Sequence, residues 1–165
     1  MARGKSAKSS GVTKTAFTFP DLHEDVASAV SDHFVAVWVG KRSKKTPNNA
    51  RSSSLKGRFT CDNSSCSKKS WPSGQVAIDI RGYPDNGYNA TVYNQRCKDC
   101  KQLGNLTLDK ACYVERVSYW LKKWAGVWVE PPVIVGKGTP PHLSELCEGC
   151  KRGSCRKGLV TLVLR

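Results

Sequence analysis

The chain has 165 residues, of which 39% are hydrophobic, and its formal net charge at pH 7 is +14. This length fits one domain, and the low apolar content predicts a modest core that needs further support. No run of about eighteen apolar residues occurs, and no apolar stretch follows the basic N-terminus, so we expect neither a membrane span nor a signal peptide. We therefore expect a cytoplasmic or nuclear protein whose positive charge suits nucleic acid, an anionic membrane surface or an acidic protein patch.

The N-terminal third is predicted to alternate unstructured and ordered segments. Residues 1–16 are rich in lysine, serine and glycine and should form a disordered basic tail, followed by a single domain over 17–165. A short helix is expected at about 20–32, where apolar residues recur at helical spacing. Residues 35–40 are rich in valine and predict a strand or an extended lead. The stretch 41–56 lacks periodicity and is predicted to be a mobile loop.

The predicted loop contains basic residues and no acidic residue. Such a segment can contact phosphate groups of a nucleic acid, although its charges could equally serve only to keep a small domain soluble. The candidate nucleic-acid contacts in this loop are Lys41, Arg42, Lys44, Lys45, Arg51 and Lys56.

A β-hairpin is predicted in the middle of the chain. Residues 57–61 are predicted to form a short strand that ends at Cys61. Residues 76–80 place Val76, Ile78 and Ile80 on one face, as in a half-buried strand. The turn sequence PDNG at 84–87 follows, and residues 88–92 alternate again. We therefore expect two antiparallel strands joined by this turn.

The strongest helical pattern lies in LDKACYVERVSYWLKKWAGVW, which runs from Leu108 to Trp128. Its apolar side chains recur at i, i+3, i+4 and i+7, and lysines lie among the tryptophans. These rings could form a base-stacking platform, but the spacing favours the core face of an amphipathic helix. The residues of this stripe are Tyr113, Val117, Trp120, Leu121, Trp124 and Trp128.

Two cysteine pairs flank the predicted hairpin. Cys61 and Cys66 form a C-x4-C pair, and Cys97 and Cys100 form a C-x2-C pair. Zinc takes four thiolates in a tetrahedron, and an antiparallel hairpin brings the two pairs together. Reduced, closely spaced thiols favour metal over disulfides. The pattern predicts a zinc ribbon whose metal is structural, since thiolates fill all four positions.

A second cysteine group lies near the C-terminus. Cys147, Cys150 and Cys155 supply three thiols and leave a fourth ligand missing. His142 lies five residues before the first of them, and Cys112 is the remaining cysteine of the chain. The spacing favours His142 and leaves Cys112 as the alternative, so a second structural zinc is predicted.

No constellation of catalytic residues is evident. The aspartates form no acid–base pair, the C-x2-C pair lacks a thioredoxin-like strand–helix setting, and zinc explains the thiols better than a cysteine nucleophile does. We therefore do not expect an enzyme.

Three stretches together resemble the 3CxxC-type zinc-finger family: RFTCDNSSCSKKSWPSGQVAIDI, YNQRCKDCKQ and PHLSELCEGCKRGSC. That family includes the receptor-transporting proteins and, in part, the C-terminal domain of the zygote-arrest proteins. The likeness covers about residues 57–157, including Trp71 before the GQV strand. It implies His142 as the fourth ligand of the second zinc, and the zygote-arrest likeness implies RNA binding. Two features depart from the family: the first pair is C-x4-C, and the membrane segment of receptor-transporting proteins is missing from this sequence.

We therefore predict an α+β fold, in which a small zinc-ribbon-like antiparallel sheet carries an N-terminal helix and one long amphipathic helix. Two structural zinc ions are expected to hold it. The first takes Cys61, Cys66, Cys97 and Cys100, and the second takes His142, Cys147, Cys150 and Cys155. The expected function is binding of RNA or another nucleic acid. The alternative is a protein-interaction adaptor, or a trafficking or chaperone-like helper, without catalytic activity.

Overall fold

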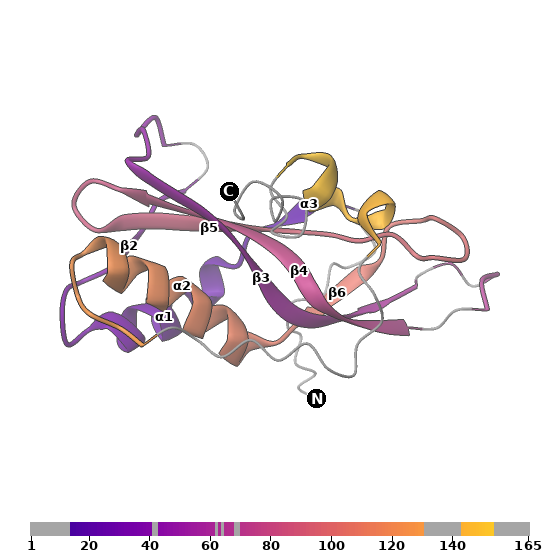
Figure 1. The fold of residues 1–165 in the computed structure, drawn as a ribbon, viewed down its shortest axis with the longest axis horizontal. Coiled ribbons are helices and arrows are strands. Elements are labelled where there is room, and N and C mark those ends of the chain that lie inside the picture. The colour runs from indigo at the N-terminus through magenta and orange to yellow at the C-terminus, as the bar shows by residue number, and fades with distance from the viewer. Residues whose placement is uncertain are drawn as a thin grey trace.

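The computed structural model describes residues 14–40, 43–61, 63, 65–67, 70–130 and 143–153. The strands are β1 Ala16–Phe17, β2 Val37–Trp38, β3 Asn49–Thr60, β4 Ser70–Tyr83, β5 Gly87–Tyr93 and β6 Asn105–Leu108. The helices are α1 His23–Val30, α2 Lys110–Trp124 and α3 Glu148–Lys151, with 3-10 turns η1 Pro20–Leu22 and η2 Ser144–Leu146. The strands form one sheet in the order β1-β5-β4-β3-β6, and β2 pairs in parallel with β5 (Figure 1).

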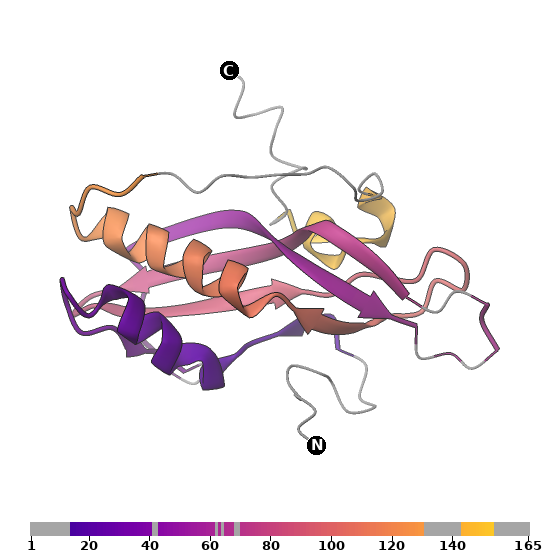
Figure 2. The same ribbon diagram turned by 90° about the horizontal axis from the view of Figure 1, so that it is seen from below.

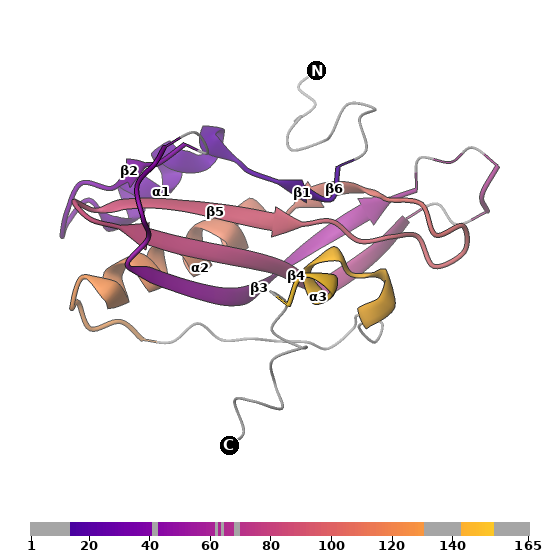
Figure 3. The same cartoon turned by 90° about the horizontal axis from the view of Figure 1, so that it is seen from above.

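The sheet is a long, twisted layer with helices on both faces. Helices α1 and α2 lie side by side on one face, and the short α3 lies on the other (Figures 2 and 3). The main core fills the space between the sheet and the α1–α2 pair. Its largest fully buried side chains are Tyr88, Tyr113, Phe59, Leu55, Ile78, Ile80 and Leu106.

The β4–β5 hairpin is confirmed where the sequence predicts it. Ile78 pairs with Val92 and Ile80 with Ala90, all fully buried. The turn between the strands has two consecutive left-handed residues, Asp85 and Asn86, with φ of 63° and 64°. Two such residues define the hairpin turn whose twist matches that of its strands.

The loop predicted over 41–56 is wrong for its second half. Strand β3 begins at Asn49 and pairs antiparallel with β4, with Arg51 opposite Ile80. The residues of this half are mostly serine, asparagine and lysine, so no apolar alternation reveals the strand. Pairing with the long apolar β4 forms it, since strand preference depends on neighbours more than on the residues themselves.

The tail predicted over 1–16 also ends earlier than expected. Ala16 pairs with Tyr93 in the short strand β1. Two residues just before it are held as well, because the Asn94 side chain donates to the Lys14 carbonyl at 2.7 Å and the Asn94 amide donates to the Thr15 carbonyl at 2.9 Å. Residues 1–13 lie outside the described part of the chain.

The helix expected at 20–32 is observed as η1 followed by α1, which ends at Val30. Helix α2 begins at a cap in which the Asp109 carboxylate accepts a hydrogen bond from the Cys112 amide at 3.0 Å. Among the described helices, none combines the length and the apolar character needed to span a membrane.

The aromatic stripe of α2 divides into two parts. Tyr113, Val117 and Leu121 are buried in the core, as the helical pattern predicts. Trp120 and Trp124 are only partly buried at its edge. Trp128 lies beyond the end of the helix and is 82% exposed, so it does not belong to the core face.

Candidate metal centre

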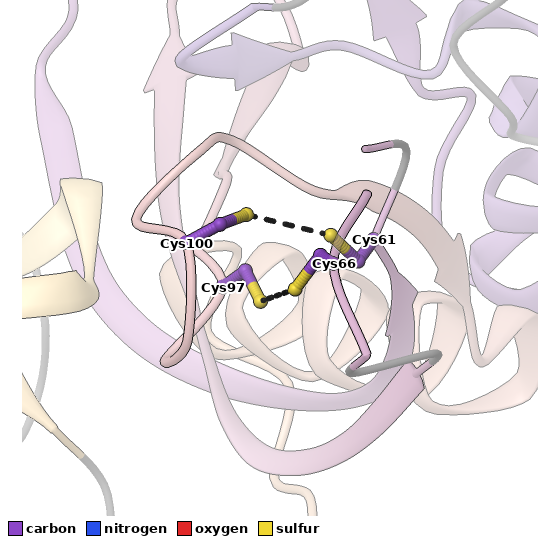
Figure 4. Close-up of side chains that lie close together, drawn as sticks. All are labelled: Cys61, Cys66, Cys97 and Cys100. Carbon is purple, nitrogen blue, oxygen red and sulfur yellow. Dashed lines mark hydrogen bonds between the residues drawn. The ribbon is translucent and has the colours of Figure 1, made fainter. Parts of the chain in front are cut away.

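Four thiols meet at one end of the sheet. Cys61 directly follows β3, Cys66 lies between it and the start of β4, and Cys97 and Cys100 lie in the turn after β5 (Figure 4). We call Cys61–Cys66 the first knuckle and Cys97–Cys100 the second knuckle. The Sγ atoms of Cys61 and Cys100 are 3.6 Å apart, those of Cys66 and Cys97 are 3.7 Å apart, and all four lie within 4.8 Å of one another.

These distances fit a tetrahedral zinc ion. Four sulfurs at about 2.3 Å from one zinc are separated from each other by about 3.8 Å. A disulfide requires about 2.05 Å between its sulfurs, and the two close pairs are far longer than that. A soft, all-thiolate donor set of this kind selects zinc over magnesium or calcium.

Each knuckle has a backbone amide that points at one of its sulfurs. The amide of Asn63 donates a hydrogen bond to the Cys61 sulfur, and the amide of Gln102 donates one to the Cys100 sulfur. The second knuckle closes through the Cys97 amide, which donates to the Gln102 carbonyl at 2.8 Å, and through Lys101, whose φ of 65° is left-handed. Amide donors stabilise thiolates, which are the form that binds metal.

The thiols influence one another's protonation. Desolvation raises the pKa of Cys61 to about 12, and the neighbouring thiols add to this while the Asn63 amide opposes it. The Gln102 amide lowers the pKa of Cys100 to about 7. Four adjacent thiolates would repel each other strongly, so a cation must compensate their charge before all four can be ionised together.

Trp71 supports the metal centre from β4. Its ring stacks on Phe59 with centroids 5.4 Å apart and planes at 15°. Its indole N–H donates to the Gln95 side-chain oxygen at 3.2 Å. A Cβ on Gly104 would lie 3.0 Å from the same ring, so the chain leaving the second knuckle passes directly against it. Trp71 therefore fixes the spacing between the strands that carry the two knuckles.

Sequence reasoning missed Asn94, which is fully buried and lies between the end of β5 and the second knuckle. Its side chain donates to the carbonyls of Lys14 and Gly104 and accepts from the amide of Gln95. Its backbone carbonyl accepts from the amide of Glu148. No pattern in the sequence points to this residue, because its partners other than Gln95 come from three separate segments of the chain.

The C-terminal cysteine group is described only in part. Cys147 and Cys150 lie in the turn that forms α3, and the Cys150 amide donates to the Cys147 sulfur at 3.3 Å. His142 and Cys155, the other two predicted ligands, lie outside the described residues. Both described thiols therefore already have the turn geometry of a cysteine knuckle, with an amide pointing at a sulfur.

Cys112, the alternative fourth ligand, lies on the other side of the sheet. It is buried in the main core at the start of α2. Cys147 instead packs with Ala77 and Tyr93. Ala77 lies between the core-facing Val76 and Ile78 of β4, and successive strand side chains point to opposite faces. The sheet therefore separates Cys112 from Cys147.

The predicted nucleic-acid contacts do not share one surface. Lys44 and Lys45 are exposed on the segment between β2 and β3. Arg51 lies on the α2 side, with its guanidinium 4.4 Å from the centre of the Trp120 ring. Lys56 is exposed and lies between Leu55 and Gly57, which both face the core, so it points to the face away from α2. Lys41 and Arg42 lie outside the described residues.

Two cysteine knuckles at the ends of antiparallel strands, which together bring four thiols to one point, define a zinc-ribbon type of protein. The family model of the 3CxxC zinc ribbon, described as a zinc-binding domain, matches residues 54–153, and the chain belongs to this family. The match includes both knuckles, Cys147 and Cys150. No curated protein and no solved structure matches the chain.

Proposed function

We propose that the chain is a non-catalytic domain held together by two structural zinc ions. The ligands of the first are Cys61, Cys66, Cys97 and Cys100, and those of the second are His142, Cys147, Cys150 and Cys155. The family membership and the sulfur distances of the first group support this assignment. Structural zinc can contribute on the order of 10 kcal/mol to the folding of such a domain.

Native mass spectrometry of the wild-type chain and of His142→Ala tests the two-zinc assignment. We expect two zinc ions in the wild type and a weakened second site in the variant, because three thiolates hold zinc less tightly than a complete tetrahedron does. One zinc in both proteins would contradict the second centre and leave the first in place.

We further propose that the domain binds single-stranded nucleic acid, with RNA as the expected ligand, through the outer side of α2. We call the following residues the α2 flank: the exposed Arg51 and Lys123, the half-buried Trp120, the buried Tyr119 ring near Lys123, and the exposed Trp128 in the segment that follows the helix. The observation that carries the proposal is its combination of unpaired cations with aromatic rings. Arg51 covers Trp120, and Lys123 lies 5.8 Å from the centre of the Tyr119 ring.

The charges and rings of the α2 flank suit both parts of a nucleotide. Among the described residues, neither Arg51 nor Lys123 forms an ion pair, so their charges are available to phosphate groups. Trp128, in the segment beyond the end of α2, is 82% exposed and presents its indole to solvent. An exposed aromatic ring binds an unpaired base by stacking, whereas a duplex hides its base faces.

Fluorescence anisotropy with one labelled RNA, single-stranded or annealed to its complement, tests this function. We expect the single strand to bind more tightly, and affinity to fall steeply as salt rises from about 50 to 200 mM, because phosphate binding releases counterions. Trp128→Ala should weaken binding to the single strand about tenfold through the loss of one stacked base. Arg51→Gln should lower the magnitude of the salt slope by about 0.7.

Two control variants match these changes. Val35→Ala removes another exposed apolar side chain, and Arg81→Gln removes a cation that pairs with Asp79 at 3.2 Å. Both should leave RNA binding within about twofold of the wild type. The absence of binding by the wild-type chain at low salt would overturn the nucleic-acid function.

A protein-interaction adaptor remains the alternative, and one observation favours it. Val35, just before the edge strand β2, and Val37, in that strand, are 77% and 45% exposed. Both valines therefore present apolar surface to solvent. Exposed apolar side chains at such a site can contribute to a protein contact. The anisotropy experiment separates the two functions, because an adaptor of this kind requires neither Trp128 nor Arg51.

A further inference from the structure

The turn that contains Cys147 and Cys150 is tied to the chain that leads into the second knuckle. We call residues 146–150 the C-terminal turn. The Arg96 amide donates to the Leu146 carbonyl at 2.7 Å, and the Glu148 amide donates to the Asn94 carbonyl at 3.1 Å. These two bonds make a short antiparallel bridge between segments about fifty residues apart in the sequence.

One side chain extends this bridge to the metal centre. The Arg96 Nε atom lies 2.9 Å from Glu148 Oε2 in the C-terminal turn. Its Nη1 atom donates to the Lys101 carbonyl at 3.0 Å, directly after Cys100. Arg96 also immediately precedes Cys97 in the chain. A single guanidinium therefore contacts the C-terminal turn and the end of the second knuckle at the same time.

Glu148, the partner of Arg96, is buried, so its carboxylate depends on this contact for its charge and its hydrogen bonds. The Glu148 side chain is 8% exposed and also meets Lys151 at 3.3 Å. Burial alone would raise the pKa of Glu148, but the hydrogen bonds from Arg96 and Lys151 outweigh it and hold the pKa below its ordinary value. Removal of the partner of a buried carboxylate costs free energy of folding. Docking of the C-terminal turn is therefore favourable only while Arg96 remains paired with Glu148.

We propose that Arg96 is a positioning residue that couples metal binding at the four-thiol centre to docking of the C-terminal turn. The proposal rests on the zinc-binding role proposed above. Metal fixes the second knuckle, and the Lys101 carbonyl with it, so that Arg96 is oriented toward Glu148. Conversely, docking of the C-terminal turn fixes Arg96, which then holds the second knuckle in its metal-binding shape. Such coupling is reciprocal, because each event must favour the other by the same factor.

Thiol alkylation of the zinc-loaded full chain tests the coupling one cysteine at a time. The protein is treated with N-ethylmaleimide at increasing concentrations of a zinc chelator, and mass spectrometry of peptides gives the chelator concentration at which each cysteine is half modified. The variants are Arg96→Gln, Arg96→Lys and Glu148→Gln. The control is Arg81→Gln, which breaks an ion pair far from the knuckles.

We expect Arg96→Gln and Glu148→Gln to lower the half-modification concentration of Cys97 and Cys100 about tenfold, as loss of a group that orients a metal ligand does. Arg96→Lys should fall between these variants and the wild type, because one ammonium cannot reach both partners as the planar guanidinium does. Arg81→Gln should match the wild type. Circular dichroism at saturating zinc checks that each variant is folded, and the isosteric Glu148→Gln decides the matter if Arg96→Gln does not fold.

The reverse direction is measured by hydrogen exchange of the C-terminal turn. Cys66→Ser damages the four-thiol centre from the first knuckle, in the segment between β3 and β4. We expect the Glu148 amide to exchange about tenfold faster in this variant, in line with the coupling. Unchanged exchange there, together with unchanged modification of Cys97 and Cys100 in Glu148→Gln, would overturn the coupling and leave the zinc role intact. Modification of all four knuckle cysteines without chelator would overturn both.

Discussion

Gly149 packs directly against Ala77, and this contact seats the C-terminal turn on the sheet. A Cβ at position 149 would overlap the Cβ of Ala77. Because both atoms belong to rigid elements, α3 and β4, neither can move aside cheaply. The glycine is therefore required by the close approach of the two backbones.

The first prediction concerns this contact. Gly149→Ala should destabilise the protein by about 1–3 kcal/mol, the usual cost of overpacking a close contact. Urea unfolding with zinc present measures the change. Gly40→Ala is the matched control, since no atom lies within 4 Å of the Cβ it would add. Equal stability of the two variants would show that the turn does not pack on Ala77.

Local patterns predicted some elements well, and the reason lies in the range of their interactions. The β4–β5 hairpin depends on alternation within one segment and on the turn residues Asp85 and Asn86, all of which can be read locally. Strand β3 depends on pairing with β4, and its serines carry no signal of their own. The helical period of α2 identified a core face but could not show that Trp128 lies beyond the helix end.

The metal centre shows the same division between local and distant information. The spacing of the four knuckle cysteines predicted their meeting, because each pair needs only a short loop and one hairpin. The roles of Asn94 and Arg96 could not be predicted. The Arg96 side chain contacts Glu148 in the C-terminal turn, and the Asn94 side chain bonds to the carbonyls of Lys14 and Gly104. Their neighbours in the sequence reveal neither set of contacts.

The second prediction compares two buried cysteines. Cys97 is fully buried among the four thiols, and Cys112 is 6% exposed in the main core. Cys97→Ser should remove one zinc from the native mass spectrum, since it breaks the four-thiolate set. Cys112→Ala should keep the wild-type zinc content and cost about 1 kcal/mol through its small cavity. Loss of zinc from Cys112→Ala would contradict the placement of this residue outside both metal sites.

The third prediction compares two buried tyrosines. Tyr88 donates or accepts a hydrogen bond with His23 Nδ1 at 2.8 Å, whereas the Tyr113 hydroxyl has no partner among the described residues. Tyr88→Phe should destabilise the protein by about 1 kcal/mol, and Tyr113→Phe should be neutral or stabilising, because it removes a buried hydroxyl that satisfies nothing. Thermal unfolding of both variants provides the comparison. A larger loss of stability for Tyr113→Phe than for Tyr88→Phe would show that its hydroxyl has a partner.

The fourth prediction concerns Asn94, whose side chain holds three segments together. Asn94→Ala removes its bonds to the Lys14 and Gly104 carbonyls, which are 2.7 and 2.9 Å long. We expect a loss of about 3 kcal/mol, because buried acceptors are left without donors and the alanine also leaves a cavity. Asn49→Ala is the control, since Asn49 is exposed at the start of β3.

Hydrogen exchange locates the effect of Asn94→Ala as well as its size. Strand β1 depends on this side chain through Lys14, so the backbone amides of Ala16 and Phe17 should exchange faster than in the wild type. The hairpin amides of β4 and β5 are held by their own pairing and should change only through the lower global stability. Uniform acceleration across the sheet, with no excess at β1, would mean that Asn94 serves the core as a whole and does not attach the N-terminal strand.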